Sequence, residues 1–523
     1  MIGRRRYFPW SKLFIGVFAF TFVFANFHQI AFASDTDQQV PVGDLRSLFK
    51  QARKLDRKSQ FDEAEALYRR ILDADSHFTD AKLALAYLLA KRHSIREAYS
   101  IAFDVAKAEP NNARAFSVLG ASLLMAGNFK DARMCFMKSL SLSRKDDLAW
   151  AALGMLDFYE NRIDDSLANL EEAAYREPDE PDYFFALGQV SARAEKYKES
   201  ADAYRRFLSI AGVMDADRRS RIKGLIDFLT FLGQRTSLYT TDGSDQTSVP
   251  FELIGNRPII KVRINDSDVP LKFVLDTGSG ISVISDKTAK KLKIHEVTRG
   301  GFAKGIGGDG TFQIVYGFVR EFGIGDVRIR NVPVYIRHFH STSESIDGYI
   351  GLSLISKFLT TIDYGNLSFD LSKKDSAIEP SASSELSLPL RLTSSGFLSG
   401  EVKLQGIEDK FNFIVDTGAS VSVISDEIAG LNEVSRYERN EKMRVIGSAG
   451  VTEDVPSFTL PKVTFGNNSC ESVAAVALDL GMINEASGFQ QAGILGGNFL
   501  RNYRLTFDFR NSKVIFVPIA SIK

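Results

Sequence analysis

The hydrophobic pattern in the first half of the chain repeats every 34 residues. A Leu-Gly pair recurs at this interval. A small residue also recurs at this interval, and an apolar residue stands four positions after it. The pairs begin at Leu119, Leu153 and Leu187, and the small residues are Ala64, Ala98, Ala132, Ser166 and Ser200. Apolar positions three to four residues apart are typical of an amphipathic helix. The repeat therefore predicts a stack of helix pairs over residues 45–235.

These units resemble tetratricopeptide repeats, each of which is a pair of antiparallel helices. About five units fit the pattern, although the first two lack the Leu-Gly pair. A small residue on one helix lets its neighbour approach closely, and stacked units bury faces that no unit could bury alone. The resemblance implies a curved array whose concave surface can bind an extended peptide or a partner protein. An array that only spaces the domains is the alternative.

Beyond residue 235 the helical period gives way to short runs rich in β-branched and aromatic residues. Runs such as residues 259–264 and 327–336 predict strands. One segment occurs twice, as FVLDTGSGISVISD at residues 273–286 and as FIVDTGASVSVISD at residues 413–426. An apolar pair followed by glycine comes later in each copy. We therefore expect a β-rich lobe that has been duplicated within the chain.

The changes in composition predict the order of domains. We expect the helical array at residues 45–235, a polar linker at residues 236–250, a first lobe at residues 251–372, a second linker at residues 373–388 and a second lobe at residues 389–523. The fold class is thus multidomain α and β, with an α-helical solenoid followed by a mostly β, bilobal part.

Each lobe carries Asp-Thr-Gly directly after an apolar strand. A strand that runs into this tripeptide ends with a carboxylate on a tight turn, and the glycine lets the backbone turn sharply. One such loop is an ordinary turn, because Asp and Gly are common turn residues. Two loops at equivalent positions of duplicated lobes indicate a paired site. Asp276 and Asp416 are therefore the candidate catalytic residues.

With these loops, residues 249–519 resemble the pepsin and retropepsin class of aspartic peptidases. The resemblance implies that Asp276 and Asp416 meet at the bottom of a cleft and activate a water molecule without a metal or organic cofactor. It also implies supporting roles for residues of the two loops and for the later glycines. These residues are Thr277, Gly278, Ser279 and Gly351 in the first lobe, and Thr417, Gly418, Ala419 and Gly496 in the second.

The chemistry of such a pair follows from charge repulsion. Two carboxylates about 3 Å apart share one proton and titrate as a coupled pair. Pepsin-like lobes have Ser or Thr where the first lobe has Ser279, and viral-type lobes have Ala, as at Ala419. This difference predicts unequal protonation of the two aspartates and leaves open which one ionises first.

Glycine-rich segments also stand at matching distances after each aspartate. In the family such a hairpin folds over the cleft as a flap. The flap candidates are Gly305, Gly307 and Gly308 in the first copy, and Gly447 and Ser448 in the second. Plain hairpin turns are the alternative, and the sequence has no clear counterpart of the flap tyrosine of pepsin-like enzymes.

Charge and cysteine content narrow the possible partners. Lys+Arg and Asp+Glu are both 65, so no net field attracts nucleic acid. The six histidines and two cysteines show no spacing typical of metal ligands, and we expect no metal site. Cys135 and Cys470 are expected to be unpaired thiols.

The N-terminus has the pattern of a secretory signal. Three arginines at residues 4–6 precede an apolar run at residues 13–25, and Ala-Phe-Ala follows at residues 31–33. This order predicts a signal peptide at residues 1–33 that is cleaved after Ala33, and hence an exported protein, periplasmic or secreted. An uncleaved membrane anchor is the alternative.

These observations together predict an aspartic endopeptidase that hydrolyses peptides or proteins and has a helical array able to bind a protein partner. One alternative is a peptide-binding or scaffold protein that has lost catalysis. Another is a dimer in which each lobe pairs with a lobe of a second chain. The presence of both loops in one chain favours a monomer.

Overall fold

The computed structural model describes residues 42–212, 216–235, 237–265, 267–308, 310–340, 345–374, 376 and 386–519. The predicted signal peptide at residues 1–33 lies outside the described residues, as does most of the predicted linker at residues 373–388. Within the described ranges, no helix has both the length and the apolar character that a membrane crossing requires.

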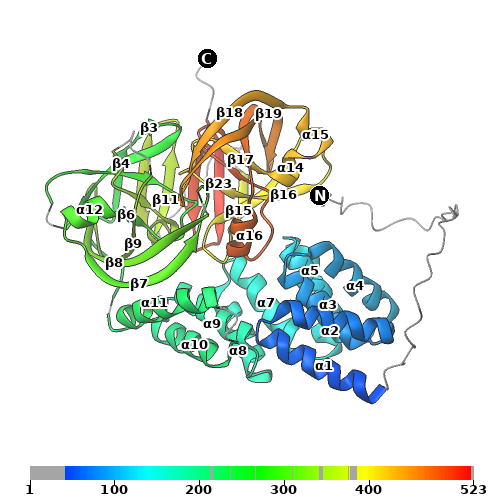
Figure 1. The fold of residues 1–523 in the computed structure, drawn as a ribbon. Helices are drawn as coiled ribbons and strands as arrows, with labels where there is room; N and C mark the ends of the chain where they lie inside the picture. The colour runs from blue at the N-terminus through cyan, green and yellow to red at the C-terminus, as the bar shows by residue number, and fades with distance from the viewer. Residues whose placement is uncertain are drawn as a thin grey trace.

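The first half of the chain is helical, as the 34-residue repeat predicts. Successive helices pack as antiparallel pairs and build the curved array at the bottom of Figure 1. The helices are α1 (Val42–Arg57), α2 (Phe61–Ala74), α3 (Thr79–Lys91), α4 (Ile95–Ala108), α5 (Ala113–Met125), α6 (Phe129–Leu142), α7 (Asp147–Tyr159), α8 (Ile163–Arg176), α9 (Pro181–Arg193), α10 (Tyr197–Ile210) and α11 (Ala216–Gly233).

The repeated small residues explain how closely the helices pack. A Cβ atom added to Gly120 would stand 2.6 Å from the Phe136 ring, and one added to Gly188 would stand 2.7 Å from the Tyr204 ring. The hydroxyl of Ser200 donates to the carbonyl of Gly188 at 2.7 Å. Glycine, serine and the large apolar residue of the repeat therefore form one contact between the two helices of a unit.

Ion pairs join the start of the array to its later repeats. Arg57 at the end of α1 pairs with Glu177 at 3.1 Å. Lys91 of α3 pairs with Asp56 at 2.7 Å and lies 3.7 Å from Asp182 of α9. The inner surface between α1, α3 and α9 is thus lined by charged side chains that already have partners.

The second half folds as two β-rich lobes, and its described strands form three sheets. The first lobe has a nine-stranded sheet in the order β1-β9-β6-β10-β5-β4-β8-β7, with β3 beside β4. Its strands are β1 (Thr240–Gly243), β3 (Glu252–Ile254), β4 (Arg257–Ile264), β5 (Leu271–Leu275), β6 (Val283–Ser285), β7 (His295–Lys304), β8 (Thr311–Ile324), β9 (Val327–Arg337) and β10 (Gly348–Ile350). The short helices α12 (Asp286–Lys291) and α13 (Leu352–Ile355) complete it.

The second lobe has an eight-stranded sheet in the order β14-β15-β16-β21-β17-β20-β19-β18. Its strands are β14 (Arg391–Leu392), β15 (Leu398–Leu404), β16 (Lys410–Val415), β17 (Ser422–Ser425), β18 (Glu438–Ile446), β19 (Val451–Phe465), β20 (Asn468–Leu478) and β21 (Gly493–Leu495). Its helices are α14 (Asp426–Ala429), α15 (Asn432–Ser435), α16 (Gly481–Ser487) and α17 (Gly497–Leu500).

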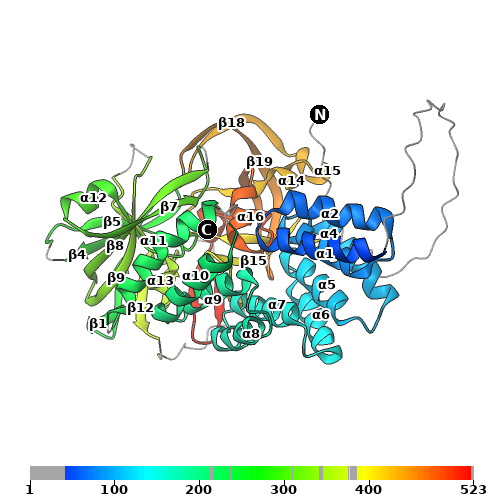
Figure 2. The same ribbon diagram turned by 60° about the horizontal axis from the view of Figure 1, so that its bottom comes forward.

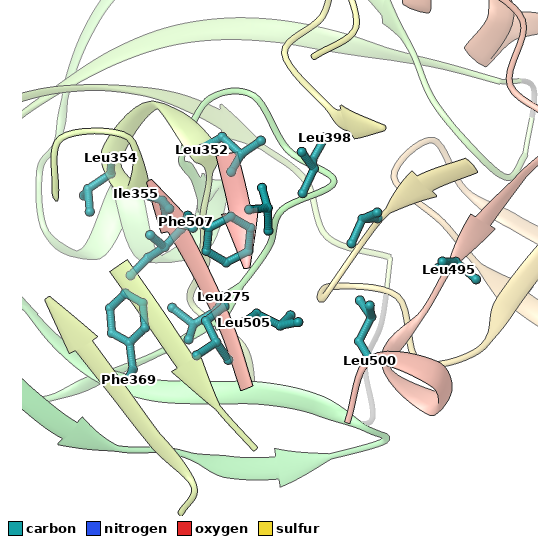
Figure 3. Packing of buried hydrophobic residues seen from close by; sticks show 14 of the residues in the cluster. Leu275, Leu352, Leu354, Ile355, Phe369, Leu398, Leu495, Leu500, Leu505 and Phe507 are labelled. Carbon is teal, nitrogen blue, oxygen red and sulfur yellow. The ribbon is translucent and has the colours of Figure 1, made fainter. Parts of the chain in front are cut away.

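A six-stranded sheet joins the lobes. Its order is β13-β23-β22-β11-β12-β2, so it contains strands of both lobes side by side. These strands are β2 (Gln246–Pro250), β11 (Phe358–Asp363), β12 (Ser368–Lys373), β13 (Leu386–Pro389), β22 (Tyr503–Asp508) and β23 (Lys513–Pro518). Figure 3 shows the buried side chains around this sheet, from Leu275 of the first lobe to Leu495 of the second. One apolar core therefore spans both lobes.

The composition of residues 236–250 predicted a polar linker, but part of this segment forms strands. β1 pairs with β9 and β2 pairs with β12, both antiparallel. Strands at a sheet edge keep one side exposed to water, so serine and threonine are tolerated there. β13 likewise begins at Leu386, inside the predicted second linker, and pairs with β23.

The helical array packs against the first lobe through α11, as Figures 1 and 2 show. Phe228 of α11 stacks on Tyr316 of β8 with ring centroids 4.5 Å apart. A Cβ atom added to Gly224 would stand 2.3 Å from the Cα atom of Gly300 in β7. The backbones of the helix and of the β7–β8 hairpin are therefore nearly in contact.

A second contact joins the array to the second lobe. Phe489, which follows α16, is fully buried among side chains of the helices. Its ring centroid lies 5.0 Å from that of Phe129 and 5.1 Å from that of Tyr159. The N–H of Gln490 donates to the carbonyl of Met125 at 2.8 Å. The repeats and the lobes thus share an apolar interface.

Replacement of Phe489 by alanine is expected to destabilise the protein by about 3 kcal/mol, because the cavity would open between the array and the second lobe. Calorimetry of the full chain should show unfolding at a lower temperature. The control is Phe302→Ala, since that ring is 61% exposed. Equal unfolding temperatures for the two variants would contradict the interface.

Candidate active site

The duplicated loops begin where two equivalent strands end. β5 runs parallel to β10, with Leu275 opposite Ile350, and β16 runs parallel to β21. The N–H of Asp276 donates to the carbonyl of Ile350 at 3.0 Å, and the N–H of Asp416 donates to that of Leu495 at 2.9 Å. Each aspartate is thus fastened to the strand beside its own.

Thr277 and Thr417 cross-link the two loops. The hydroxyl of Thr277 donates to the carbonyl of Val415 at 2.6 Å, and that of Thr417 donates to the carbonyl of Leu275 at 2.7 Å. Each hydroxyl also accepts from the backbone N–H of the other threonine, at 3.2 and 3.1 Å. Both side chains are fully buried, so these four bonds are shielded from water.

The loop glycines leave room for the opposite carboxyl group. A Cβ atom added to Gly278 would stand 2.4 Å from the carboxyl carbon of Asp416. One added to Gly418 would stand 2.7 Å from the carboxyl carbon of Asp276. Any other residue at either position would force the two carboxyls apart. The structure therefore brings Asp276 and Asp416 together within a single chain.

Gly351 and Gly496 lie directly behind the loops. The N–H of Gly351 donates to the hydroxyl of Ser282, and that of Gly496 donates to the hydroxyl of Ser422, both at 3.1 Å. A Cβ atom added to either glycine would stand 2.7 Å from backbone atoms that follow the Asp-Thr-Gly turn. Each glycine therefore allows its strand to pass close beneath the loop.

The two carboxyls differ in their electrostatic surroundings. Burial and the neighbouring Asp416 raise the pKa of Asp276 well above its ordinary value. Burial also raises the pKa of Asp416, but a hydrogen bond from Asp276 and backbone N–H groups oppose this rise. Those of Gly418 and Ala419 donate to Asp416 at 2.7 and 3.2 Å, whereas Asp276 accepts from Gly278 at 3.0 Å. These backbone donors favour the ionised form of Asp416 over that of Asp276.

In pepsin-like lobes the resemblance implies that the Ser or Thr at the position of Ser279 hydrogen-bonds the carboxylate, but Ser279 does not. Its hydroxyl donates to the carbonyl of Ile281 at 2.7 Å rather than to a carboxylate. The equivalent residue of the second loop, Ala419, contributes through its backbone N–H. The asymmetry of the pair therefore arises from the backbone around Asp416 rather than from the serine side chain.

Both flap candidates are tips of β-hairpins, and the tips touch. Gly305, Gly307 and Gly308 lie between β7 and β8, and Gly447 and Ser448 lie between β18 and β19. The N–H of Ala449 donates to the carbonyl of Ile306 at 2.8 Å. Positive φ angles of 90° and 56° at Gly307 and Gly308 form the first tip. The two hairpins thus meet across the boundary between the lobes.

The sequence analysis missed one charged residue of the site, Arg337 at the end of β9. Its Nη1 donates to the carbonyl of Ser448 in the second hairpin tip at 2.7 Å. Its charge also opposes the rise in the pKa of Asp276. The only signal in the sequence is a cation that directly follows the apolar run at residues 332–336.

Comparisons with known proteins agree with this architecture. Residues 260–354 and 400–499 match the aspartyl protease family model, and residues 57–121 and 151–214 match two tetratricopeptide-repeat models. A search of curated proteins gave no significant match.

Similar solved structures fall into the same two groups. An aspartic proteinase from Irpex lacteus is 14% identical, with a TM-score of 0.36, over 53% of this chain and 98% of its own. A thermophilic TPR protein from Thermus thermophilus is 18% identical, with a TM-score of 0.30, over 35% of this chain and 98% of its own. YrrB, described as a TPR protein with an unusual peptide-binding site, is 20% identical, with a TM-score of 0.21, over 33% of this chain and 88% of its own.

The chain thus combines helical repeats that match tetratricopeptide-repeat models with two β-rich segments that match the aspartyl protease family model.

Proposed function

We propose that the protein is an aspartic endopeptidase that cleaves peptides or proteins. The observation that carries this proposal is the pair of half-buried carboxyls, each seated against the glycine of the opposite loop. Their unequal pKa values provide a base and an acid in one place, and such a pair is what water activation requires. The protease family match supports the same reaction class.

In the proposed mechanism each aspartate has one role. Ionised Asp416 takes a proton from a water molecule as its oxygen attacks the scissile carbonyl carbon. Protonated Asp276 donates a hydrogen bond to the carbonyl oxygen, where negative charge develops. As the tetrahedral intermediate collapses, a proton passes to the leaving nitrogen and the C–N bond breaks. The two carboxyls then share one proton again.

The hairpin tips serve as flaps in this proposal. Their hydrogen bond between Ala449 and Ile306 must break, or shift, for a peptide to enter. Closure over the peptide would exclude bulk water and strengthen the polar contacts of the dyad. Since α11 packs on the β7–β8 hairpin, the helical array fixes the strands of this hairpin, and only its tip moves as the first flap.

A specific surface of the array suits an acidic partner. A cavity of about 710 Å³ lies beside α1 and is also bordered by Asp80 and Asp179. Its cationic lining consists of Arg46, Lys50, Arg53, Lys54 and Lys58, together with Arg57, which already pairs with Glu177. We propose that this cavity, rather than the ion-paired inner surface, binds an acidic segment of a substrate or partner protein.

Single substitutions Asp276→Asn and Asp416→Asn should each reduce hydrolysis of an unbiased peptide mixture by about 100-fold or more, because each removes one proton-transfer group. Mass spectrometry of the digest measures the loss. The matched controls are Asp286→Asn and Asp426→Asn, since these exposed aspartates end the same duplicated segments. Hydrolysis that persists in either dyad variant would contradict the mechanism, and a wild type without hydrolysis would favour the binding protein.

The dependence of kcat/KM on pH should be bell-shaped. Below the lower pKa both carboxyls are protonated and no base is present, whereas above the upper pKa both are ionised and no acid is present. Because both pKa values are raised from 3.8, the active range should extend toward neutral pH. Initial rates on one peptide across the acidic and neutral range measure the profile. A rate that keeps rising above neutral pH would contradict the assignment.

The basic cavity should bind an acidic peptide more weakly when Lys50 and Arg53 are both changed to glutamate. We expect at least a tenfold weaker binding, equivalent to ~1.4 kcal/mol, in titrations that follow fluorescence anisotropy. Added salt should also weaken the wild-type complex. The control changes Lys107 and Lys130, which are exposed elsewhere on the array, to glutamate. Equal binding by both double variants would contradict the proposed site.

A further inference from the structure

The two lobes have the same strand pairing around the dyad but different side chains. In the first lobe Arg337 lies opposite Ser285, where β9 runs parallel to β6. In the second lobe Leu478 lies opposite Ser425, where β20 runs parallel to β17. Arg337 and Leu478 therefore occupy equivalent positions of the duplicated fold, one on each side of the dyad.

A second pair of equivalent positions shows the same contrast. Tyr349 pairs with Val274 in the strand next to Asp276, and Ile494 pairs with Ile414 in the strand next to Asp416. The first lobe thus places an arginine and a tyrosine where the second lobe places a leucine and an isoleucine.

The side chains beside the dyad in the second lobe are apolar. Leu478 and Ile494 belong to one buried cluster, against which Ala419 of the catalytic loop packs. Ile306, from the tip of the first flap, covers the same cluster. If the first flap moves and withdraws Ile306, this side presents an apolar surface, which suits an aliphatic or aromatic substrate side chain.

The first-lobe side surrounds a guanidinium with aromatic rings. The Arg337 guanidinium carbon lies 5.3 Å from the centre of the Phe312 ring, 5.0 Å from that of Phe339 and 5.7 Å from that of Tyr349. Rings at these distances hold the cation in place without neutralising it. Its hydrogen bond to the Ser448 carbonyl uses one N–H of the five that a guanidinium carries.

In the part of the chain that the structure describes, Arg337 makes no direct ion pair, and the longer-range charge of Asp276 acts on it. Burial lowers the pKa of this guanidinium by more than the charges of Tyr349 and Asp276 raise it. A partly buried charge is costly unless a partner of opposite sign is supplied. A ligand in the cleft is positioned to supply that partner, because Arg337 lies between the second flap tip and Asp276.

We propose that Arg337 forms a subsite for an acidic side chain of the substrate, close to the scissile bond, and that Leu478 and Ile494 form an apolar subsite across the dyad. This inference rests on the proposed peptidase function for its substrate. The planar guanidinium matches a carboxylate with two parallel hydrogen bonds. Cleavage should therefore prefer peptides with Asp or Glu on one side of the scissile bond and an apolar residue on the other.

Arg337 could instead only hold the second flap closed through the Ser448 carbonyl. That role needs one donor and no substrate carboxylate, so it predicts no preference between glutamate and glutamine. Substrate recognition and flap closure can be distinguished with two peptides that differ only in having Glu or Gln at one position. The measured quantity is kcat/KM for the Glu peptide divided by kcat/KM for the Gln peptide. A general loss of flap closure lowers both values equally and leaves this ratio unchanged.

The test uses sets of peptides in which one position near the cleaved bond carries Glu, Gln or Lys, and it measures kcat/KM for each peptide. At about pH 6 the substrate glutamate is ionised, since its ordinary pKa is ~4.3. Wild type should prefer Glu over Gln by about tenfold or more at one position, equivalent to ~1.4 kcal/mol. Arg337→Gln should abolish the preference, and Arg337→Glu should shift it toward Lys. The control is Arg444→Gln, an exposed arginine of the second flap hairpin.

A binding measurement keeps this test separate from catalysis. The same peptides are titrated calorimetrically into Asp416→Asn, with and without Arg337→Gln. Tighter binding of the Glu peptide that disappears with Arg337→Gln supports the subsite even if no variant hydrolyses peptides. Equal binding of the Glu and Gln peptides, or a preference that survives Arg337→Gln, would overturn it. Absence of hydrolysis by wild type would by contrast count against the peptidase function alone.

Discussion

The reciprocal hydrogen bonds of Thr277 and Thr417 are the interaction on which the rest of the site depends. They are buried, they cross the boundary between the lobes, and each hydroxyl both donates and accepts. Because they fix the loops directly behind the carboxyls, the separation of Asp276 and Asp416 is set by the fold and not by the flexibility of two side chains. A buried network of this kind specifies one arrangement, since a lost partner would leave an unsatisfied polar group.

The symmetry of the duplicated lobes is broken around the two carboxyls. Backbone donors around Asp416 favour its ionised form, while burial beside that charge keeps the proton on Asp276. The two lobes also differ in side chains, with Arg337 in the first lobe where the second lobe has Leu478. The helical array adds a third difference, because α11 packs on the flap hairpin of the first lobe. That flap is therefore supported by the repeats, and a partner bound to the array could alter it.

Much of this architecture could be predicted from the sequence, because it is repeated there. The 34-residue period and the two Asp-Thr-Gly segments identify the array, the lobes and the dyad. The strands β1 and β2 were missed because their polar residues follow no alternation strong enough to distinguish an edge strand from a linker. The contact of Phe489 with the helices and the position of Arg337 were missed for another reason. Both depend on how distant segments meet, and a single phenylalanine or arginine carries no local signal of that.

The central claim is that one chain supplies both halves of the catalytic pair. The most direct test mixes Asp276→Asn and Asp416→Asn chains after joint unfolding and refolding, and measures peptide hydrolysis. If the two lobes of each chain form its own site, every site holds one asparagine and the mixture stays as inactive as its components. Recovery of hydrolysis in the mixture would show that an intact first lobe had paired with an intact second lobe of another chain, and would contradict the account.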